Sequence, residues 1–182
     1  MSRHQHISRR NALFGIGGAG AALAAMSGPR ETFAMAAQTP ETGEGNAMRP
    51  YLTLETAQTA VDAALEKATE IGVPMIAVVV DDSGTMKAFA RQDNAFLGSV
   101  TIAEDKAITA VSFQGPTRQL AEAFGSDPVM LVSFANRENI TLIGGGYPIM
   151  QNDTLVGGIG VSGGSAEQDQ ECAEAGLEAI SN

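Results

Sequence analysis

Histidine is nearly absent from this chain of 182 residues, and the two that it has, His4 and His6, lie close to the N-terminus. The residues around them have the pattern of an export signal, so the sequence predicts a mature protein without imidazole. That excludes Ser-His-Asp and Cys-His nucleophilic sites, and zinc or copper sites built from imidazole nitrogens. Function is therefore expected to rest on carboxylates, hydroxyls, Lys, Arg, Met, one thiol and backbone dipoles.

Cysteine and basic residues are also scarce. Cys172 is the sole cysteine, so no disulfide can form within the chain. The chain has 11 Lys and Arg against 21 Asp and Glu; loss of residues 1–36 removes four arginines and one glutamate, which leaves 7 against 20 and a net charge of −13. Because such a chain repels phosphate backbones and shows no basic stripe, nucleic acid is not an expected partner.

Residues 1–36 are predicted to be a twin-arginine signal peptide. Arg9 and Arg10 precede an apolar run rich in Gly and Ala at residues 12–26, and the small residues at 34–36 suit a signal peptidase. A membrane anchor is the alternative, but the run is shorter than the roughly 20 residues that a spanning helix needs. We therefore expect a periplasmic or secreted protein with no stable membrane insertion.

Two further segments follow the predicted signal. Residues 37–50 are polar and rich in Pro, Gly, Thr and Glu, without apolar periodicity, which indicates a flexible linker. Residues 51–182 have a length typical of one domain.

The first half of this domain predicts a helix and then a β-hairpin. Apolar residues recur three and four positions apart over residues 54–71, with Thr53 as the N-cap and Gly72 as the stop. Residues 75–80 are typical of a strand covered on both sides, and residues 85–91 return antiparallel to it.

The second strand of this hairpin is predicted to carry a face suited to a ligand. Strict alternation places Met86, Ala88 and Ala90 on one side of the strand. It places Lys87, Phe89 and Arg91 on the other. This second side combines two cations with an aromatic ring.

The second half predicts three further helices and a second hairpin around one unassigned segment. Helices are expected at residues 99–113, with a capping box at Thr101 and Glu104, and at residues 117–124. Residues 125–139 resist assignment, because 129–134 could be a strand or a lining loop. Residues 144–149 and 155–163 form a second hairpin, and a capping box at Ser165 and Gln168 opens a last helix to residue 180.

Eight glycines fall between Gly144 and Gly164. Such density in strands indicates close approach of a flat ligand or of another backbone, and helix-on-sheet packing or a subunit contact explains it equally well. Neither glycine run has the spacing of a phosphate-binding loop, so nucleotide phosphates are not expected ligands.

Several motifs in order carry a resemblance to a known family. They are Asp81-x-x-Gly84, Arg91-x-Asp93-x-Ala95-x-x-x-Ser99, Lys106-Ala107-x-Thr109-Ala110, Pro116-Thr117, Gly145-Gly146-x-Pro148-Ile149, Gly160-Val161-Ser162-Gly163 and Gln168-Asp169-x-x-Cys172-Ala173. Over residues 52–180 the chain resembles the GlcG/HbpS-like haem-binding (haem-degrading) family, which is related to the C-terminal domain of PduO-type proteins. The resemblance implies an α+β, profilin-like fold with a five-stranded antiparallel sheet, assembly into homo-oligomers, and a haem or other tetrapyrrole ligand.

The resemblance also implies candidate ligands for a haem iron. Secreted haem-binding members use a threonine near the surface, and Thr109 and Thr117 lie in the matching region. Asn94 stands where the family usually has Gly, and Tyr147 where an aliphatic residue is usual. Tyr147 is either a phenolate ligand or a packing residue with its hydroxyl at the surface.

A ligand pocket is predicted around Arg91, Ser99 and Lys106, beside Gly145 and Gly146. The two cations could grip a carboxylate of a haem or of a small organic acid. Asp93 could orient Arg91 or act as a catalytic base if the protein is an enzyme. In the alternative, Arg91 pairs with Asp93 to pin a loop and Lys106 caps a carbonyl.

The acidic residues and the cysteine of the last helix are expected to have structural rather than catalytic roles. Asp169 is expected to favour the helix dipole rather than to catalyse, and Cys172 to face the core. The stripe of Glu167, Glu171, Glu174 and Glu178 is expected to be a solvated face, with loose binding of a metal ion as the alternative.

Three functions remain open at this point. The first is an exported haem or tetrapyrrole binder. The second is a periplasmic enzyme that acts on a small hydroxy- or oxo-acid through Asp93. The third is an oligomeric interaction protein whose glycine-rich hairpin is an assembly surface.

Overall fold

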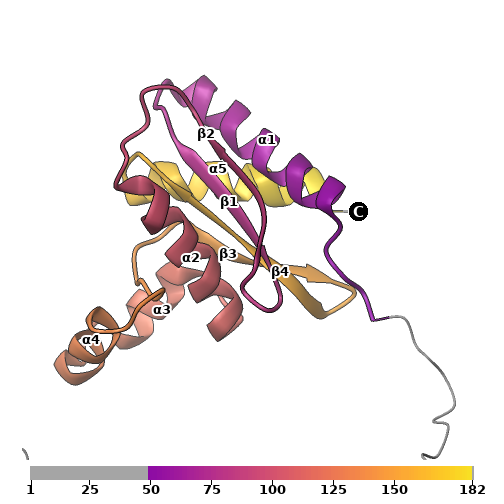
Figure 1. The fold of residues 1–182 in the computed structure, drawn as a ribbon. Coiled ribbons are helices and arrows are strands. Elements are labelled where there is room, and N and C mark those ends of the chain that lie inside the picture. The colour runs from indigo at the N-terminus through magenta and orange to yellow at the C-terminus, as the bar shows by residue number, and fades with distance from the viewer. Residues whose placement is uncertain (1–48, 182) are drawn as a thin grey trace, which may run out of the picture. The chain divides into compact units, whose positions relative to one another are not determined.

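The structure is a computed structural model, and it describes residues 49–181. Its elements are α1 (Leu54–Ile71), β1 (Ile76–Asp81), β2 (Met86–Arg91), α2 (Ser99–Phe113), α3 (Thr117–Phe124), α4 (Pro128–Ala135), β3 (Gly146–Gln151), β4 (Thr154–Ser162) and α5 (Ala166–Ile180) (Figure 1). The predicted signal peptide and most of the predicted linker lie outside the described residues. No helix within 49–181 combines the length and the apolar character needed to cross a bilayer.

The sheet is antiparallel, with the strands in the order β2-β1-β4-β3. The α+β class is confirmed, but the prediction of five strands is wrong for the described residues, which form four. The unassigned segment supplies no strand because it forms α4. Asp127 caps this helix by accepting hydrogen bonds from the backbone N–H groups of Val129 and Met130, and Pro128 suits its first turn.

Helices cover both faces of the sheet, as Figure 1 shows: α1 and α5 on one face and α2 on the other. Ala77, Val79 and Val161 belong to the core with α1 and α5. Ile76 and Val78 belong to the core with α2. All hydrophobic residues of β1 are fully buried, so the prediction of a strand covered on both sides is confirmed.

The glycines of β3 and β4 let α2 pack directly against the sheet. A Cβ atom at Gly146, Gly158 or Gly160 would lie within 3.0 Å of a backbone oxygen of α2. Those oxygens belong to Lys106, Ala107 and Ala103 respectively. Helix-on-sheet packing, one of the explanations that the sequence left open, therefore accounts for these three glycines.

Helix caps follow the sequence at three positions and depart from it at one. Thr53 caps α1, Gly72 ends it in the left-handed conformation, and Ser165 forms the predicted capping box with Gln168. The capping box predicted at Thr101 is wrong. The helix begins at Ser99, three residues earlier than that cap requires, and the Thr101 hydroxyl donates to the carbonyl of Gly98 instead.

Candidate functional site

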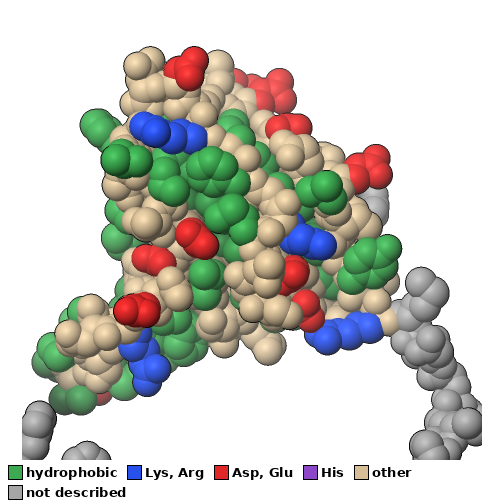
Figure 2. All heavy atoms as spheres, in the orientation of Figure 1, with side chains coloured by type: hydrophobic (Ala, Val, Ile, Leu, Met, Phe, Trp, Pro, Cys, Tyr) green, Lys and Arg blue, Asp and Glu red, His purple; other side chains and the backbone are tan. Residues whose placement is uncertain are grey.

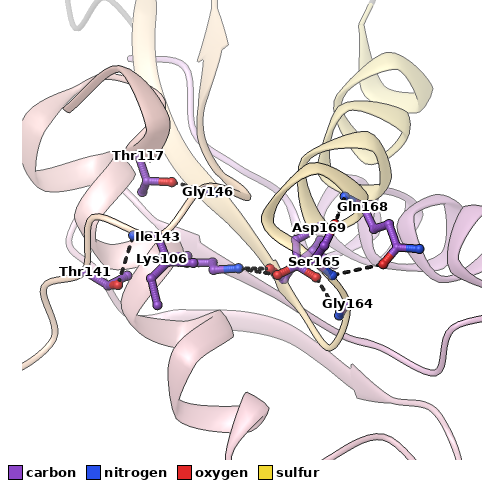
Figure 3. Close-up of polar contacts among 10 residues, drawn as sticks. Lys106, Thr117, Thr141, Ile143, Gly146, Gly164, Ser165, Gln168 and Asp169 are labelled. Carbon is purple, nitrogen blue, oxygen red and sulfur yellow. Dashed lines mark hydrogen bonds and ion pairs between the residues drawn. The ribbon is translucent and has the colours of Figure 1, made fainter. Parts of the chain in front are cut away.

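Lys106 is fully buried, and its ammonium group contacts other groups of the protein. Its Nζ lies 2.6 Å from Oδ2 of Asp169 and donates a second hydrogen bond, of 2.8 Å, to the carbonyl of Val161 (Figure 3). The Oδ1 atom of Asp169 accepts from the backbone N–H of Gly164 at 2.9 Å. The contact with Val161 matches the alternative in which Lys106 caps a carbonyl.

The Lys106–Asp169 pair joins α2 to the first turn of α5. Burial lowers the pKa of Lys106 from its ordinary value, and the carboxylate of Asp169 opposes that shift. Gly145 makes room for the pair, since a Cβ there would lie 2.8 Å from Cβ of Asp169 and 3.0 Å from Nζ of Lys106. The sequence singled out all three residues, but their contact across 63 positions had no local signal.

The two threonines named as candidate iron ligands are both fully buried. The Thr109 hydroxyl donates to the carbonyl of Asp105 at 2.6 Å and accepts from the backbone N–H of Thr141 at 2.9 Å. The Thr117 hydroxyl accepts from the N–H of Gly146 at 3.0 Å (Figure 3). Both hydroxyls therefore hold backbone segments together, at positions closed to solvent.

Tyr147 lies on the face covered by α1 and α5. It pairs with Ile159 of β4, packs against that core, and donates its hydroxyl to Oε1 of Glu174 on α5 at 2.5 Å. Burial and the neighbouring carboxylate raise the pKa of Tyr147 well above its ordinary value, so the phenolate form is disfavoured. This geometry corresponds to the packing role rather than to an iron ligand.

The residues predicted to form one pocket make separate contacts. Arg91 is exposed and donates through Nε and Nη2 to the carbonyl of Ala95, at 3.2 and 2.6 Å. Asp93 makes no salt bridge with Arg91 in the described part of the chain and lines a separate hollow of about 240 Å³ beside the end of α1. Ser99 is 8% exposed, and Lys106 is engaged in the core.

The structure instead creates a surface that sequence alternation missed. The pairing of β1 with β2 shifts register between Val79 and Val80. Val79 pairs with Ala88, and the next residue, Val80, pairs with Met86, so Lys87 is left without a partner on β1. Paired residues of antiparallel strands point to the same side of the sheet, and a bulge reverses the alternation. Met86 therefore shares a face with Phe89 and Arg91, and its predicted placement with Ala88 is wrong.

This face of β2 is uncovered, because α2 packs over β1, β4 and β3. Met86 and Phe89 are each 41% exposed, and the loop that Arg91 holds through Ala95 presents Phe96 and Leu97 at 73% and 75% exposure. We call these side chains of Met86, Phe89, Arg91, Phe96 and Leu97 the open face. Figure 2 shows hydrophobic side chains gathered over β2 and α2, with Lys and Arg side chains at the border.

The acidic stripe of α5 is engaged in pairwise contacts. Glu167 pairs with Arg118 at 3.3 Å, Glu171 with Lys67 at 3.0 Å, and Glu174 accepts the hydroxyl of Tyr147. Within residues 49–181 no three His, Cys, Asp or Glu side chains gather closely enough to hold a metal ion.

The fold and this surface define an α+β protein whose antiparallel sheet leaves one edge strand open, apolar and bordered by cations. Residues 52–178 match the family described as haem degrading protein HbpS-like. The chain belongs to this family, as the motif resemblance predicted.

Relatives and solved structures agree with that assignment. The chain is 35% identical over 131 residues to an uncharacterized 15.0 kDa protein of the dhaT-dhaS intergenic region of Citrobacter freundii. The aligned residues make up 71% of this chain and 92% of that protein. The crystal structure of HbpS is 34% identical with a TM-score of 0.68, covering 74% of this chain and 93% of that one. The crystal structure of a PduOC–haem complex is 32% identical with a TM-score of 0.66, covering 71% and 95%.

Proposed function

We propose that this protein binds haem, or a related tetrapyrrole, on the open face of β2. The observation that carries the proposal is the alignment of Met86, Phe89 and Arg91 on a strand face that no helix covers. The membership in the HbpS-like family and the similarity to a PduOC–haem complex support the same ligand.

The chemistry of the open face fits a flat, apolar macrocycle that carries carboxylates. Phe89, Phe96 and Leu97 supply exposed apolar surface for the macrocycle. The Nη1 group of Arg91 is not used by Ala95, so it can donate to a carboxylate, and Lys87 lies in the adjoining bulge.

Met86 offers a thioether on this face as a ligand for the iron, in a chain whose two histidines precede residue 7. When bound, haem would supply an iron centre for redox or oxygen chemistry. The side chains of the open face would hold and orient the macrocycle.

The acid–base enzyme that the sequence left open gains no support from the geometry. In that enzyme Lys106 and Arg91 would bind the carboxylate of the substrate together. The ammonium of Lys106 instead donates hydrogen bonds to Asp169 and to the carbonyl of Val161. Haem binding is therefore the function that the arrangement favours.

Haem titration of the full chain tests the proposal. Arg91→Ala removes the carboxylate partner and Phe89→Ala removes the stacking surface, so each is expected to weaken haem binding about tenfold. Matched controls are Arg49→Ala, which breaks an exposed salt bridge to Asp82, and Phe113→Ala, whose ring has 40% exposure against 41% for Phe89. Absence of a Soret shift at micromolar haem, or equal losses in the controls, would overturn the proposal.

We also propose that the protein is exported by the twin-arginine route to the periplasm or beyond. Arg9 and Arg10, followed by an apolar run and a small-residue cleavage pattern, support this location. Replacing both with Lys should retain the full-length chain in the cytoplasm, whereas Arg3→Lys should not. Normal processing of the double variant, seen by cell fractionation, would contradict it.

A further inference from the structure

We infer that the protein has a second binding site, for a small uncharged ring compound that carries a hydroxyl or amide group. The site is a hollow of about 580 Å³, a size typical of small-molecule sites. We call it the hairpin hollow; it is lined by residues of 51–56, 148–152 and 177–181, together with Val156.

The hairpin hollow is separate from the open face. Its walls are the start of α1, the end of β3 and the end of α5, and Figure 1 shows these parts at the same end of the domain. The open face lies on β2, and β2 and β3 are the two opposite edges of the sheet. The inference is therefore independent of haem binding.

A bulge in the second hairpin builds the apolar floor of the hollow. The pairing of β3 with β4 shifts register after Ile149, which leaves Val156 without a partner on β3. Val156 and Ile149 are both buried in the core beneath α1 and α5, so the bulge turns an additional apolar side chain to this face. Leu52 completes the floor, because its Cδ2 atom lies where a side chain of Gly157 would be, 2.8 Å from the position of a Cβ.

The rim of the hairpin hollow carries amides and hydroxyls. Gln151 lies two residues after Ile149, so its side chain leaves β3 on the same face, and both Gln151 and Asn152 are exposed. The hydroxyls of Thr53 and Thr56 lie on the side of α1, 2.8 Å from each other. Amides and hydroxyls both donate and accept hydrogen bonds, so the rim can bind either kind of polar group on a ligand.

The lining selects an uncharged ligand. The chain has 21 Asp and Glu, yet none of the described side chains that line the hairpin hollow is charged. An ion on the apolar floor would lose hydration, with no opposite charge in the lining to compensate. A neutral ring with one polar group loses much less, since the floor contacts the ring and the rim replaces the water.

Tyr51 favours a ring over a flexible chain. Its own ring lines the hairpin hollow and is 66% exposed, although the next residue, Leu52, is buried in the floor. An aromatic ring gains contact from a second ring placed beside it. A flexible chain would lose more conformational freedom in the same space.

Calorimetric titration of the full chain tests the ligand class with three probes of similar shape and different charge. They are 2-naphthol, which is uncharged at pH 7, 2-naphthoate and 2-naphthylmethylammonium. We expect 2-naphthol to bind with a dissociation constant of about 1 mM or lower. The two ions should bind at least about tenfold more weakly, and equal affinity for all three probes would overturn the inference.

Occlusion of the hollow tests the location. Thr56→Trp places a large ring inside it and should raise the dissociation constant of 2-naphthol at least about tenfold. Thr59→Trp is the matched control, because Thr59 is exposed on the same helix and does not line the hollow. Thermal melts monitored by circular dichroism establish that both variants fold.

A rim variant tests the polar contact without adding bulk. Gln151→Ala removes one amide and should weaken 2-naphthol binding about fivefold, the effect of one hydrogen bond. Gln58→Ala removes an exposed amide from α1 outside the hollow and should leave the affinity unchanged. Equal losses in these two variants would contradict the assignment.

Three further outcomes would overturn the inference. One is a full chain that binds no 2-naphthol at millimolar concentration, and another is a Thr56→Trp variant that binds it like the wild type. The third is displacement of 2-naphthol by haem, which would make the hairpin hollow part of the tetrapyrrole site. Haem affinity, measured in parallel, should be unchanged in Thr56→Trp, because the open face lies on β2.

Discussion

The ammonium of Lys106 and the carboxylate of Asp169 lie 2.6 Å apart, with the two side chains 0% and 4% exposed. The pair connects the middle of α2 to the first turn of α5, and each partner also hydrogen-bonds the backbone, at Val161 and at Gly164. Every strong polar group in this cluster therefore has a partner. The consequence is that the cluster holds the fold together and is closed to ligands.

Removing one member of this pair should destabilise the protein severely. Lys106→Met leaves the Asp169 carboxylate buried without its cation, and such losses typically cost about 3–5 kcal/mol in the free energy of unfolding. The control is Lys67→Met, which breaks an exposed pair with Glu171 and should lower the free energy of unfolding far less, because solvent screens that pair. Urea denaturation followed by circular dichroism measures both. Equal midpoints for the two variants would contradict the structural role of Lys106.

Substitution of Gly160 should separate α2 from the sheet. The Cβ atom of Gly160→Ala would lie within 3.0 Å of the carbonyl oxygen of Ala103 and the backbone nitrogen of Ala107. Neither backbone atom can move alone, so we expect a loss of about 3 kcal/mol in the free energy of unfolding. Gly98→Ala is the control, since no atom lies within 4 Å of its Cβ, and it should cost less than about 1 kcal/mol. A fully stable Gly160→Ala would show that this contact is not tight.

The buried thiol of Cys172 should make stability depend on alkaline pH. Burial, and secondarily the charge of Asp169, raises the pKa of Cys172 to about 11, whereas a thiol in an unfolded chain has a pKa of about 8.5. Between these values the unfolded chain releases a proton that the folded chain keeps. This contribution to stability is therefore complete below pH 8.5 and is lost as the pH rises, by at most about 1.4 kcal/mol per pH unit.

Urea denaturation of the wild type and of Cys172→Ala, repeated between pH 7.5 and 10.5, isolates this contribution. The wild type should lose stability more steeply with rising pH than the variant does. The difference in slope is the quantity to compare, because the variant also loses packing. Parallel slopes would mean that the thiol pKa is ordinary in the folded state.

Because the register shift in β2 places the Met86 thioether on the open face, this side chain is expected to bind the iron of a bound haem. Met86→Leu preserves the apolar surface but removes the thioether, so we expect a changed haem absorption spectrum with less than about a tenfold change in affinity. Met150→Leu is the matched control, because Met150 is 51% exposed on the other edge strand, β3. Identical spectra for the wild type and Met86→Leu would exclude Met86 as a ligand, whatever the result for Arg91.

Local patterns in the sequence predicted every helix except α4, because caps and periodicity act over three or four residues. The stop of α1 at Gly72 and the capping box of Ser165 and Gln168 are such signals. The hairpins followed from β-branched runs and turn residues. The family motifs added haem as a ligand, but they suggested threonines that the structure buries, at Thr109 and Thr117.

What the sequence determined by itself is four of the five helices and both hairpins, the acidic charge and the near absence of imidazole, since each depends on neighbouring residues or on composition alone. Tertiary structure decided which of the candidate side chains remain accessible. It joined Lys106 to Asp169 across 63 positions and turned Met86 to the face of Phe89 through a bulge. Contacts of that kind depend on how strands register and helices pack, and no spacing along the chain encodes them.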